Sequence, residues 1–116
     1  MSVKSRKRVR YPRGHGAAVL FAALGDETRL VLVGRLSHGR ASSISQLTKG
    51  SGLTRQAITK HLRVLGDAGL VHSTKEGREN LFEFNPAPVD ELKAYLERVS
   101  ADWDAALGRL RKFVEE

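Results

Sequence analysis

Basic and amide side chains gather on one side of a segment that begins after Thr54 and reads as a helix. Arg55 and Gln56 fall in its first turn, and no acidic residue follows before Gly66. A guanidinium group can donate two hydrogen bonds to the edge of a guanine, and a carboxamide can pair in the same way with adenine. These residue types therefore indicate contacts with base edges in a nucleic acid groove.

Helical periodicity divides this segment into two faces. The predicted buried face is apolar except for one histidine: Ala57, Ile58, His61, Leu62 and Leu65. The opposite face carries the candidates for nucleic acid contact: Thr54, Arg55, Gln56, Thr59, Lys60 and Arg63. Thr59 suits a thymine methyl or a phosphate, and Lys60 and Arg63 suit the phosphate backbone. An ordinary solvated face is the alternative, against which the single sign of the charge argues.

A short helix expected around residues 46–49 precedes this segment. Ser43 or Ser45 can cap it, because a serine hydroxyl accepts a hydrogen bond from a free N–H group in a first helical turn. The same two serines can contact a phosphate. The two roles are compatible, and the sequence does not choose between them.

A predicted β-hairpin follows, with its turn around Gly77. Lys75 and Arg78 flank that glycine and could reach a flanking minor groove or its phosphates. Glu76 and Glu79 lie beside them and weaken the positive field. A plain solvated turn is the alternative.

The net charge of +7 is unevenly distributed over the 116 residues. Residues 1–16 carry six basic side chains and residues 28–66 carry seven, and neither segment contains an acid. A basic patch that coincides with a helical motif is typical of a protein with a polyanionic partner. We expect residues 1–16 to be a disordered basic arm, either a solubilising tail or a segment that lies on phosphates.

Cap residues and apolar spacing predict a mostly helical fold with one hairpin. Helices are expected over about residues 17–24, from a cap at Asp26 to Gly39, around 46–49, from Thr54 to Gly66, and over about 89–113. In the second helix Leu30, Val33 and Leu36 have core spacing. The hairpin lies between the last two helices. This α-α-α-α-β-β-α order over residues 17–116 is that of a winged helix-turn-helix.

The last predicted helix carries more apolar surface than a core of this size can cover. About 25 residues would make it about 37 Å long, with an apolar stripe along its whole length. Together with the apolar first helix, this stripe predicts a two-fold interface between two copies of the chain. The residues expected there are Leu20, Phe21, Leu92, Leu96, Val99, Trp103, Leu107 and Leu110. Burial of Trp103 within one chain is the alternative.

Catalytic and metal-binding patterns are missing from the sequence. The stretch GSGLTR lacks the lysine of a phosphate-binding loop, and no third group completes a serine–histidine arrangement. The chain has no cysteine, and none of its four histidines has metal-site spacing. We therefore expect no enzyme activity, no metal and no cofactor. No apolar run is long enough for a bilayer, and no secretory signal is recognisable, so we expect a cytoplasmic, nucleoid-associated protein without a membrane partner.

Three segments together resemble the ArsR family of winged-helix repressors: FAALGDETRLVLVGRL, ISQLTKGSGLTRQAITKHLRVLGDAGLV and KEGRENLFEF. The similarity covers about residues 17–113. It implies a homodimeric, sequence-specific regulator of transcription that binds double-stranded DNA. Such a protein is usually a repressor at a palindromic operator and is often released by a ligand.

The sequence departs from the metal-sensing members of that family. The cysteine motif at the short helix and the histidines of the last helix are both missing here. The resemblance therefore identifies no inducer and leaves an unidentified small molecule open. A winged helix used only for protein–protein interaction is the alternative function. The one-signed face argues against it, because a protein partner is expected to meet mixed charges.

Overall fold

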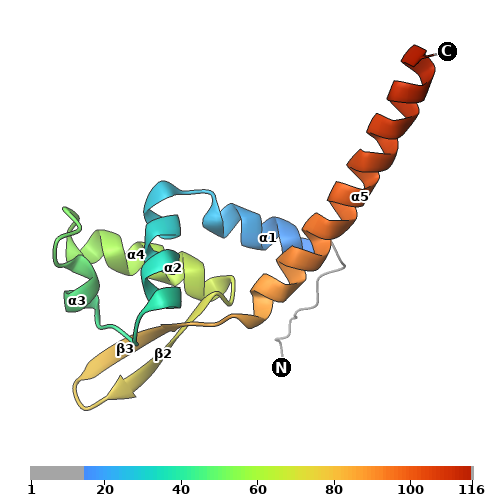
Figure 1. Cartoon of the computed structure of the whole chain (residues 1–116). Coiled ribbons are helices and arrows are strands. Elements are labelled where there is room, and N and C mark those ends of the chain that lie inside the picture. Colours follow the sequence, from blue (N-terminus) through green and yellow to red (C-terminus); the bar gives the residue numbers. More distant parts are fainter. Residues whose placement is uncertain (1–14, 116) are drawn as a thin grey trace.

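The computed structural model describes residues 15–115. The predicted basic arm, apart from its last two residues, lies outside the described part of the chain. The elements are α1 (His15–Leu24), α2 (Glu27–His38), α3 (Ile44–Thr48), α4 (Arg55–Asp67), β2 (Val71–Glu76), β3 (Glu79–Phe84) and α5 (Ala87–Glu115). Their order and type confirm the predicted arrangement of helices and hairpin (Figure 1).

Side-chain caps fix where α2 and α4 begin. The Asp26 carboxylate accepts a hydrogen bond of 3.0 Å from the backbone N–H of Arg29, and the Thr54 hydroxyl accepts one of 3.0 Å from Ala57. Both cap residues have extended backbone, as a helix N-cap requires. The caps predicted at Asp26 and Thr54 are confirmed, and they set the rotation of each helix relative to the core.

The antiparallel pair β2–β3 forms the wing, from Val71 opposite Phe84 to Glu76 opposite Glu79. Gly77 has a φ of +64°, the left-handed conformation that lets the chain reverse within two residues. The loop before α3 also pairs with β3: Ser42 and Phe82 exchange two backbone hydrogen bonds of 3.0 and 2.8 Å. This bridge attaches the wing directly to the helix-turn-helix.

The core lies between α1, α2, α4 and the base of the wing. Its buried members come from every helix: Ala17, Leu20, Ala23, Leu32, Leu36, Leu47, Ile58, Leu62, Leu65, Leu70, Val71 and Leu92. The prediction that Leu30 faces inward is wrong, since its side chain is 54% exposed. Leu36 is buried as predicted, and Leu32 occupies the inner face in place of Leu30, because two residues correspond to more than half a helical turn.

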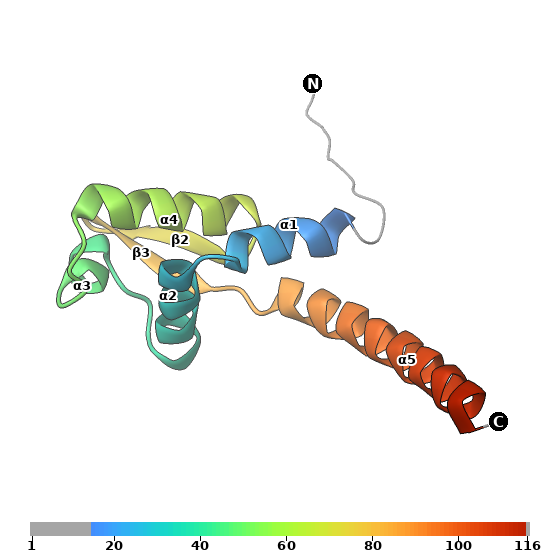
Figure 2. The same cartoon turned by 90° about the horizontal axis from the view of Figure 1, so that it is seen from above.

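Helix α5 begins two residues earlier than predicted, at Ala87. Pro88 therefore lies in its first turn, where its missing N–H group costs no hydrogen bond. The helix has 29 residues and is about 43 Å long. It packs on α1 near its start and then projects beyond the rest of the fold (Figure 2). The structure including α5 measures 68 × 41 × 21 Å.

The two leucines of α2 give a matched test of this packing. Leu32→Ala should lower the free energy of unfolding by about 2–5 kcal/mol, because it leaves a cavity among buried side chains. Leu30→Ala should change it by about 0.5 kcal/mol or less. Urea unfolding at one fixed protein concentration measures both values. Equal costs for the two variants would contradict the rotation of α2.

Candidate nucleic-acid interface

Helix α4 is amphipathic, with its apolar side held in the core and its polar side outward. Ile58, Leu62 and Leu65 are buried and anchor the helix. The six residues predicted for nucleic acid contact line one surface groove along the outer side: Thr54, Arg55, Gln56, Thr59, Lys60 and Arg63. The structure thus brings these six side chains together on an acid-free face.

Ser45 and Arg55 are joined across the turn between α3 and α4. A guanidinium nitrogen of Arg55 donates a hydrogen bond to the Ser45 hydroxyl, and both side chains are exposed. The oxygen of Ser45 is therefore an acceptor for Arg55, while its own O–H remains able to donate. A phosphate contact by Ser45 stays a prediction that this geometry permits.

Ser43 has a structural role. Its hydroxyl accepts from the backbone N–H of Gln46 at 3.2 Å, and the Gln46 side chain accepts from the backbone N–H of Ser43 at 2.8 Å. This reciprocal pair is a capping box, so the predicted cap is confirmed. The Ser43 side chain is only 4% exposed, which removes it from the surface that a phosphate would touch. We therefore correct its assignment from phosphate contact to helix cap alone.

The hydroxyl group of Thr59 already makes a hydrogen bond within α4. Its hydroxyl donates a hydrogen bond of 2.7 Å to the carbonyl oxygen of Arg55, one turn earlier. The hydroxyl proton is therefore committed to the helix backbone. Of the two predicted partners, the thymine methyl suits the half-buried Thr59 better, because its own methyl group forms the rest of its surface.

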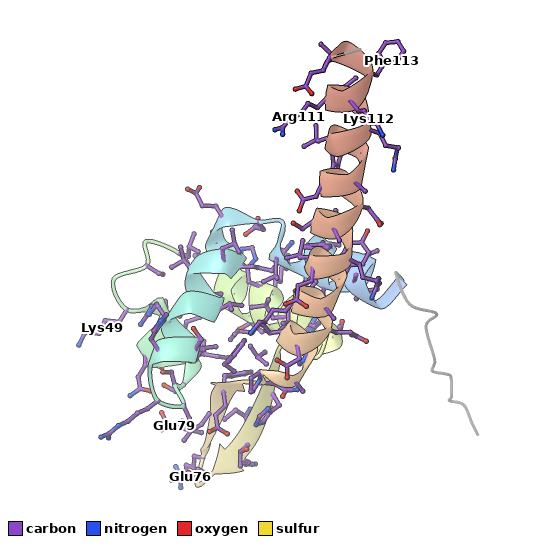
Figure 3. The ribbon with its side chains drawn as sticks, turned by 45° about the vertical axis from the view of Figure 1, so that its right-hand side comes forward. Lys49, Glu76, Glu79, Arg111, Lys112 and Phe113 are labelled. Atoms are coloured by element: carbon purple, nitrogen blue, oxygen red, sulfur yellow. The ribbon has the colours of Figure 1, made fainter. Side chains whose placement is uncertain are left out.

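The wing tip carries balanced charge. Lys75 and Arg78 are exposed, as predicted, but Glu76 lies directly opposite Glu79 in the hairpin register (Figure 3). Like charges directly opposite each other destabilise a strand pair. The two carboxylates also cancel the two cations at the tip. The wing tip therefore has no net positive charge to attract DNA, and contact by Lys75 or Arg78 stays a prediction about single side chains.

Two basic residues of α2 connect neighbouring helices by hydrogen bonds, a role that the sequence did not predict. Arg35 donates hydrogen bonds of 3.0 and 3.3 Å to the carbonyl oxygens of Leu47 and Gln46, and so holds the end of α3. Arg29 contacts the end of α1 and His61 of α4. In the sequence, both arginines precede a leucine of an otherwise apolar helix, and this position was the available sign of a structural role. Arg29 also lies within the motif LGDETRL.

Six basic side chains of residues 28–66 are exposed: Arg35, Arg40, Lys49, Arg55, Lys60 and Arg63. Within residues 15–115 the two ion pairs both involve histidine, namely His61–Asp26 at 3.8 Å and His72–Glu83 at 3.2 Å. Among these residues, none of the six exposed cations is therefore neutralised by a carboxylate in an ion pair. The positive field of this half of the chain comes from these six side chains, whereas Arg29 is half-buried.

The predicted dimer residues fall into two groups. Leu20 and Leu92 are 3% and 6% exposed within the single chain, so we correct their assignment from interface to core. Both lie where α1 meets the start of α5, so the single chain already covers them. The remaining six are partly or largely exposed: Phe21, Leu96, Val99, Trp103, Leu107 and Leu110. Trp103 is 63% exposed, which excludes its burial within one chain.

The described residues form neither a metal-binding cluster nor a membrane-spanning helix. Among residues 15–115, no group of three or more His, Asp or Glu side chains could hold a metal ion. Over the same range, no helix is both long and apolar enough to cross a bilayer.

Comparison with known proteins agrees with this architecture. A helix-turn-helix domain family matches residues 24–74. The HTH-type transcriptional regulator YuzN of Bacillus subtilis is 40% identical over 85 residues, which are 67% of this chain and 92% of that protein. The structure of an ArsR-like transcriptional regulator from Rhodococcus sp. RHA1 has a TM-score of 0.74 at 37% identity, covering 85% of this chain and 92% of that one. This chain belongs to the ArsR family.

The ArsR-family protein is thus a transcriptional regulator with a helix-turn-helix DNA-binding domain. Double-stranded DNA is the partner of this domain. The matched residues 24–74 contain all of α4 and end just before Lys75 of the wing. A probable mercury resistance operon repressor of Streptomyces lividans is 29% identical over 90 residues, which are 78% of this chain and 71% of that protein.

Lys60 offers a test of phosphate contact by α4. Lys60→Ala should weaken binding to every DNA sequence, and it should make the salt dependence of the affinity shallower by about one counterion per subunit. Lys112→Ala is the matched control, because this exposed lysine lies at the far end of α5 (Figure 3). Affinities between 50 and 200 mM salt give the slopes. An unchanged slope for Lys60→Ala would exclude its role as a phosphate contact.

Proposed function

We propose that this ArsR-family protein represses transcription as a homodimer bound to a palindromic operator. The observation that carries the proposal is the apolar stripe along the projecting part of α5. Its members recur every three or four residues: Leu96, Val99, Trp103, Leu107, Leu110 and Val114. Val99 is half-buried, and the other five side chains are at least 50% exposed. A soluble monomer rarely leaves a continuous apolar stripe of this kind in water.

A second copy of the same helix is the partner that fits this stripe best. Two α5 helices related by a two-fold axis would bury each other's stripes, and α1 would extend the contact through Phe21. Phe21 already packs edge-on against Tyr95 of α5, with ring centroids 5.9 Å apart. The two helices therefore offer one continuous apolar surface per subunit.

Dimerisation would place two copies of α4 on the same side of a duplex. Two-fold symmetric helix-turn-helix proteins bind half-sites about 34 Å apart, which is one turn of DNA. The operator is then an inverted repeat, because each α4 meets the same sequence on opposite strands. In each half-site Arg55 and Gln56 would contact base edges, while Lys60, Arg63 and Ser45 would contact the backbone.

Repression is supported by the similarity to the Streptomyces lividans repressor. A dimer that covers about two turns of promoter DNA would exclude RNA polymerase by occupying the same surface. The proposal includes no metal inducer, because this chain has no cysteine. The proposal leaves open a small-molecule inducer of unassigned chemistry.

Base contacts by the first turn of α4 can be measured directly. Arg55→Ala and Gln56→Ala should each weaken binding by roughly 1–3 kcal/mol and relax the base preference at one position of each half-site. Affinities for a set of operator variants, with every base pair changed in turn, give that preference. A loss that is equal on all sequences would show that these side chains contact only phosphates.

Trp103 tests the dimer and the function together. Trp103→Glu should shift the protein to monomer in sedimentation analysis and abolish tight binding to an inverted repeat, because it buries a charge in the apolar interface. Trp103→Phe is the control, since it keeps an aromatic ring and should stay dimeric. The DNA upstream of the gene is the duplex to use in these binding measurements. A Trp103→Glu protein that remains dimeric would contradict pairing through α5. A wild-type protein that does not bind duplex DNA even at low salt would favour the alternative function, a protein-interaction module.

A further inference from the structure

Arg29 lies where three helices meet. Its Nε donates to the carbonyl oxygen of Ala23 at 2.5 Å, and one terminal nitrogen approaches that of Ala22 at 3.4 Å. These carbonyls belong to the last turn of α1, where the carbonyl oxygen of Ala22 also accepts from the backbone N–H of Gly25 at 3.3 Å. The other terminal nitrogen lies 3.3 Å from Nδ1 of His61 on α4. One side chain of α2 thus joins the end of α1 to the middle of α4.

The contact between Arg29 and His61 fixes the state of the imidazole. A guanidinium group can only donate, so Nδ1 of His61 must be the acceptor, and its proton must be on Nε2. A neutral histidine satisfies this condition. A doubly protonated histidine does not, because both ring nitrogens then carry hydrogen and the ring repels the guanidinium group.

Asp26 completes the cluster. Its carboxylate lies 3.8 Å from Nδ1 of His61 and caps α2 through the backbone N–H of Arg29. That backbone hydrogen bond, assisted by the charge of Arg29, lowers the pKa of the Asp26 carboxyl. The carboxylate therefore stays ionised throughout the range in which histidines titrate, and it offers a protonated His61 an alternative partner.

Among the described residues, Asp26 and Arg29 are the charged groups that form an ion pair or a hydrogen bond with the imidazole. Helix α3 carries no charged residue, and α1 carries none after His15. Strand β2 meets α4 on a different side, along Leu62, Arg63 and Gly66. The His61 side chain is only 23% exposed, so its protonation must be accommodated by these neighbours.

We infer that the Arg29–His61 hydrogen bond positions α4 against α1, and that protonation of His61 releases it and lowers DNA affinity. This inference rests on the proposed function, because it assigns a regulation to the same DNA-binding helix. His61 lies one turn from Ala57 and two residues from Thr59, so a shift at His61 moves the DNA-facing side of α4. Arg29 and His61 are positioning residues, and they do not touch DNA themselves.

The sign of the effect separates it from general electrostatics. Protonating any histidine adds positive charge, which by itself strengthens binding to DNA as the pH falls. Loss of the Arg29–His61 contact acts in the opposite direction. The deciding quantity is therefore the ratio of the affinity of wild type to that of a variant that keeps the contact but does not titrate.

His61→Asn is that variant, because the amide oxygen of asparagine can occupy the position of Nδ1 and accept from Arg29. The ratio of wild-type to His61→Asn affinity for an inverted-repeat duplex should fall about tenfold from pH 8 to pH 5.5, the size expected for one hydrogen bond to a charged group. His72→Asn is the matched control. It removes a titratable charge from an exposed histidine of β2 without touching the Arg29–His61 contact, so the ratio of wild-type to His72→Asn affinity should stay constant or rise as the pH falls.

Arg29→Lys provides an independent variant. A single ammonium group cannot serve the α1 carbonyls and the imidazole together. This variant should bind DNA less tightly at pH 8, and the ratio of its affinity to that of His61→Asn should not fall from pH 8 to pH 5.5, because the contact is already lost and only the added charge of His61 acts. Circular dichroism shows whether it is folded, and His61→Asn carries the test alone if Arg29→Lys is not. A wild-type to His61→Asn ratio that stays constant or rises as the pH falls would overturn the inference.

Nitrogen-15 spectra of the free protein test the contact without DNA. His61 should show the Nε2–H tautomer at pH 8, and amide shifts of α4 should change with the same midpoint as its ring. An Nδ1–H tautomer, or α4 amides that do not follow the ring, would overturn the inference. If wild type binds no duplex at pH 8, the proposed function fails, while these spectra still decide whether the switch exists.

Discussion

The burial of one side of α4 is the constraint on which the rest of the structure depends. Ile58, Leu62 and Leu65 are buried against the other helices, which fixes the helix about its own axis. The polar side of α4 must therefore face outward, and its cations lie along one groove without acidic neighbours. Apolar burial supplies the free energy that keeps like charges gathered in this way.

The remaining elements hold that helix at a defined place. Arg35 secures α3 by its C-terminal carbonyls, and the Ser42–Phe82 bridge joins the loop before α3 to the wing. At the other end, Arg29 connects α4 to α1, and α1 packs on the first turns of α5. A series of polar contacts and buried side chains therefore connects α5 to α4. In this arrangement a dimer of α5 helices would also set the spacing between two copies of α4.

Charge has two uses in this small fold. Arginines that satisfy carbonyl oxygens at helix ends stabilise the connection between helices, and exposed lysines and arginines create the external field. All acidic residues except Asp26 and Glu27 come after residue 66, and most of them lie on the wing and α5, while Asp67 ends α4. This separation gives the molecule a basic side and a second side on which apolar contacts can form.

The sequence by itself determined the element order, the caps at Asp26 and Thr54, and the outward face of α4, because all three follow from local hydrogen bonding and from a strong period of 3.6 residues. Only the tertiary structure decided how single side chains are used. Leu30 and Leu32 differ in burial through the rotation of α2, and Leu20 and Leu92 are covered where α1 crosses α5. Ser43 is buried by its own capping box, and Arg29 meets a histidine 32 positions away. Such contacts depend on where helices distant in the sequence come together, and periodicity within one helix carries no information about its neighbours.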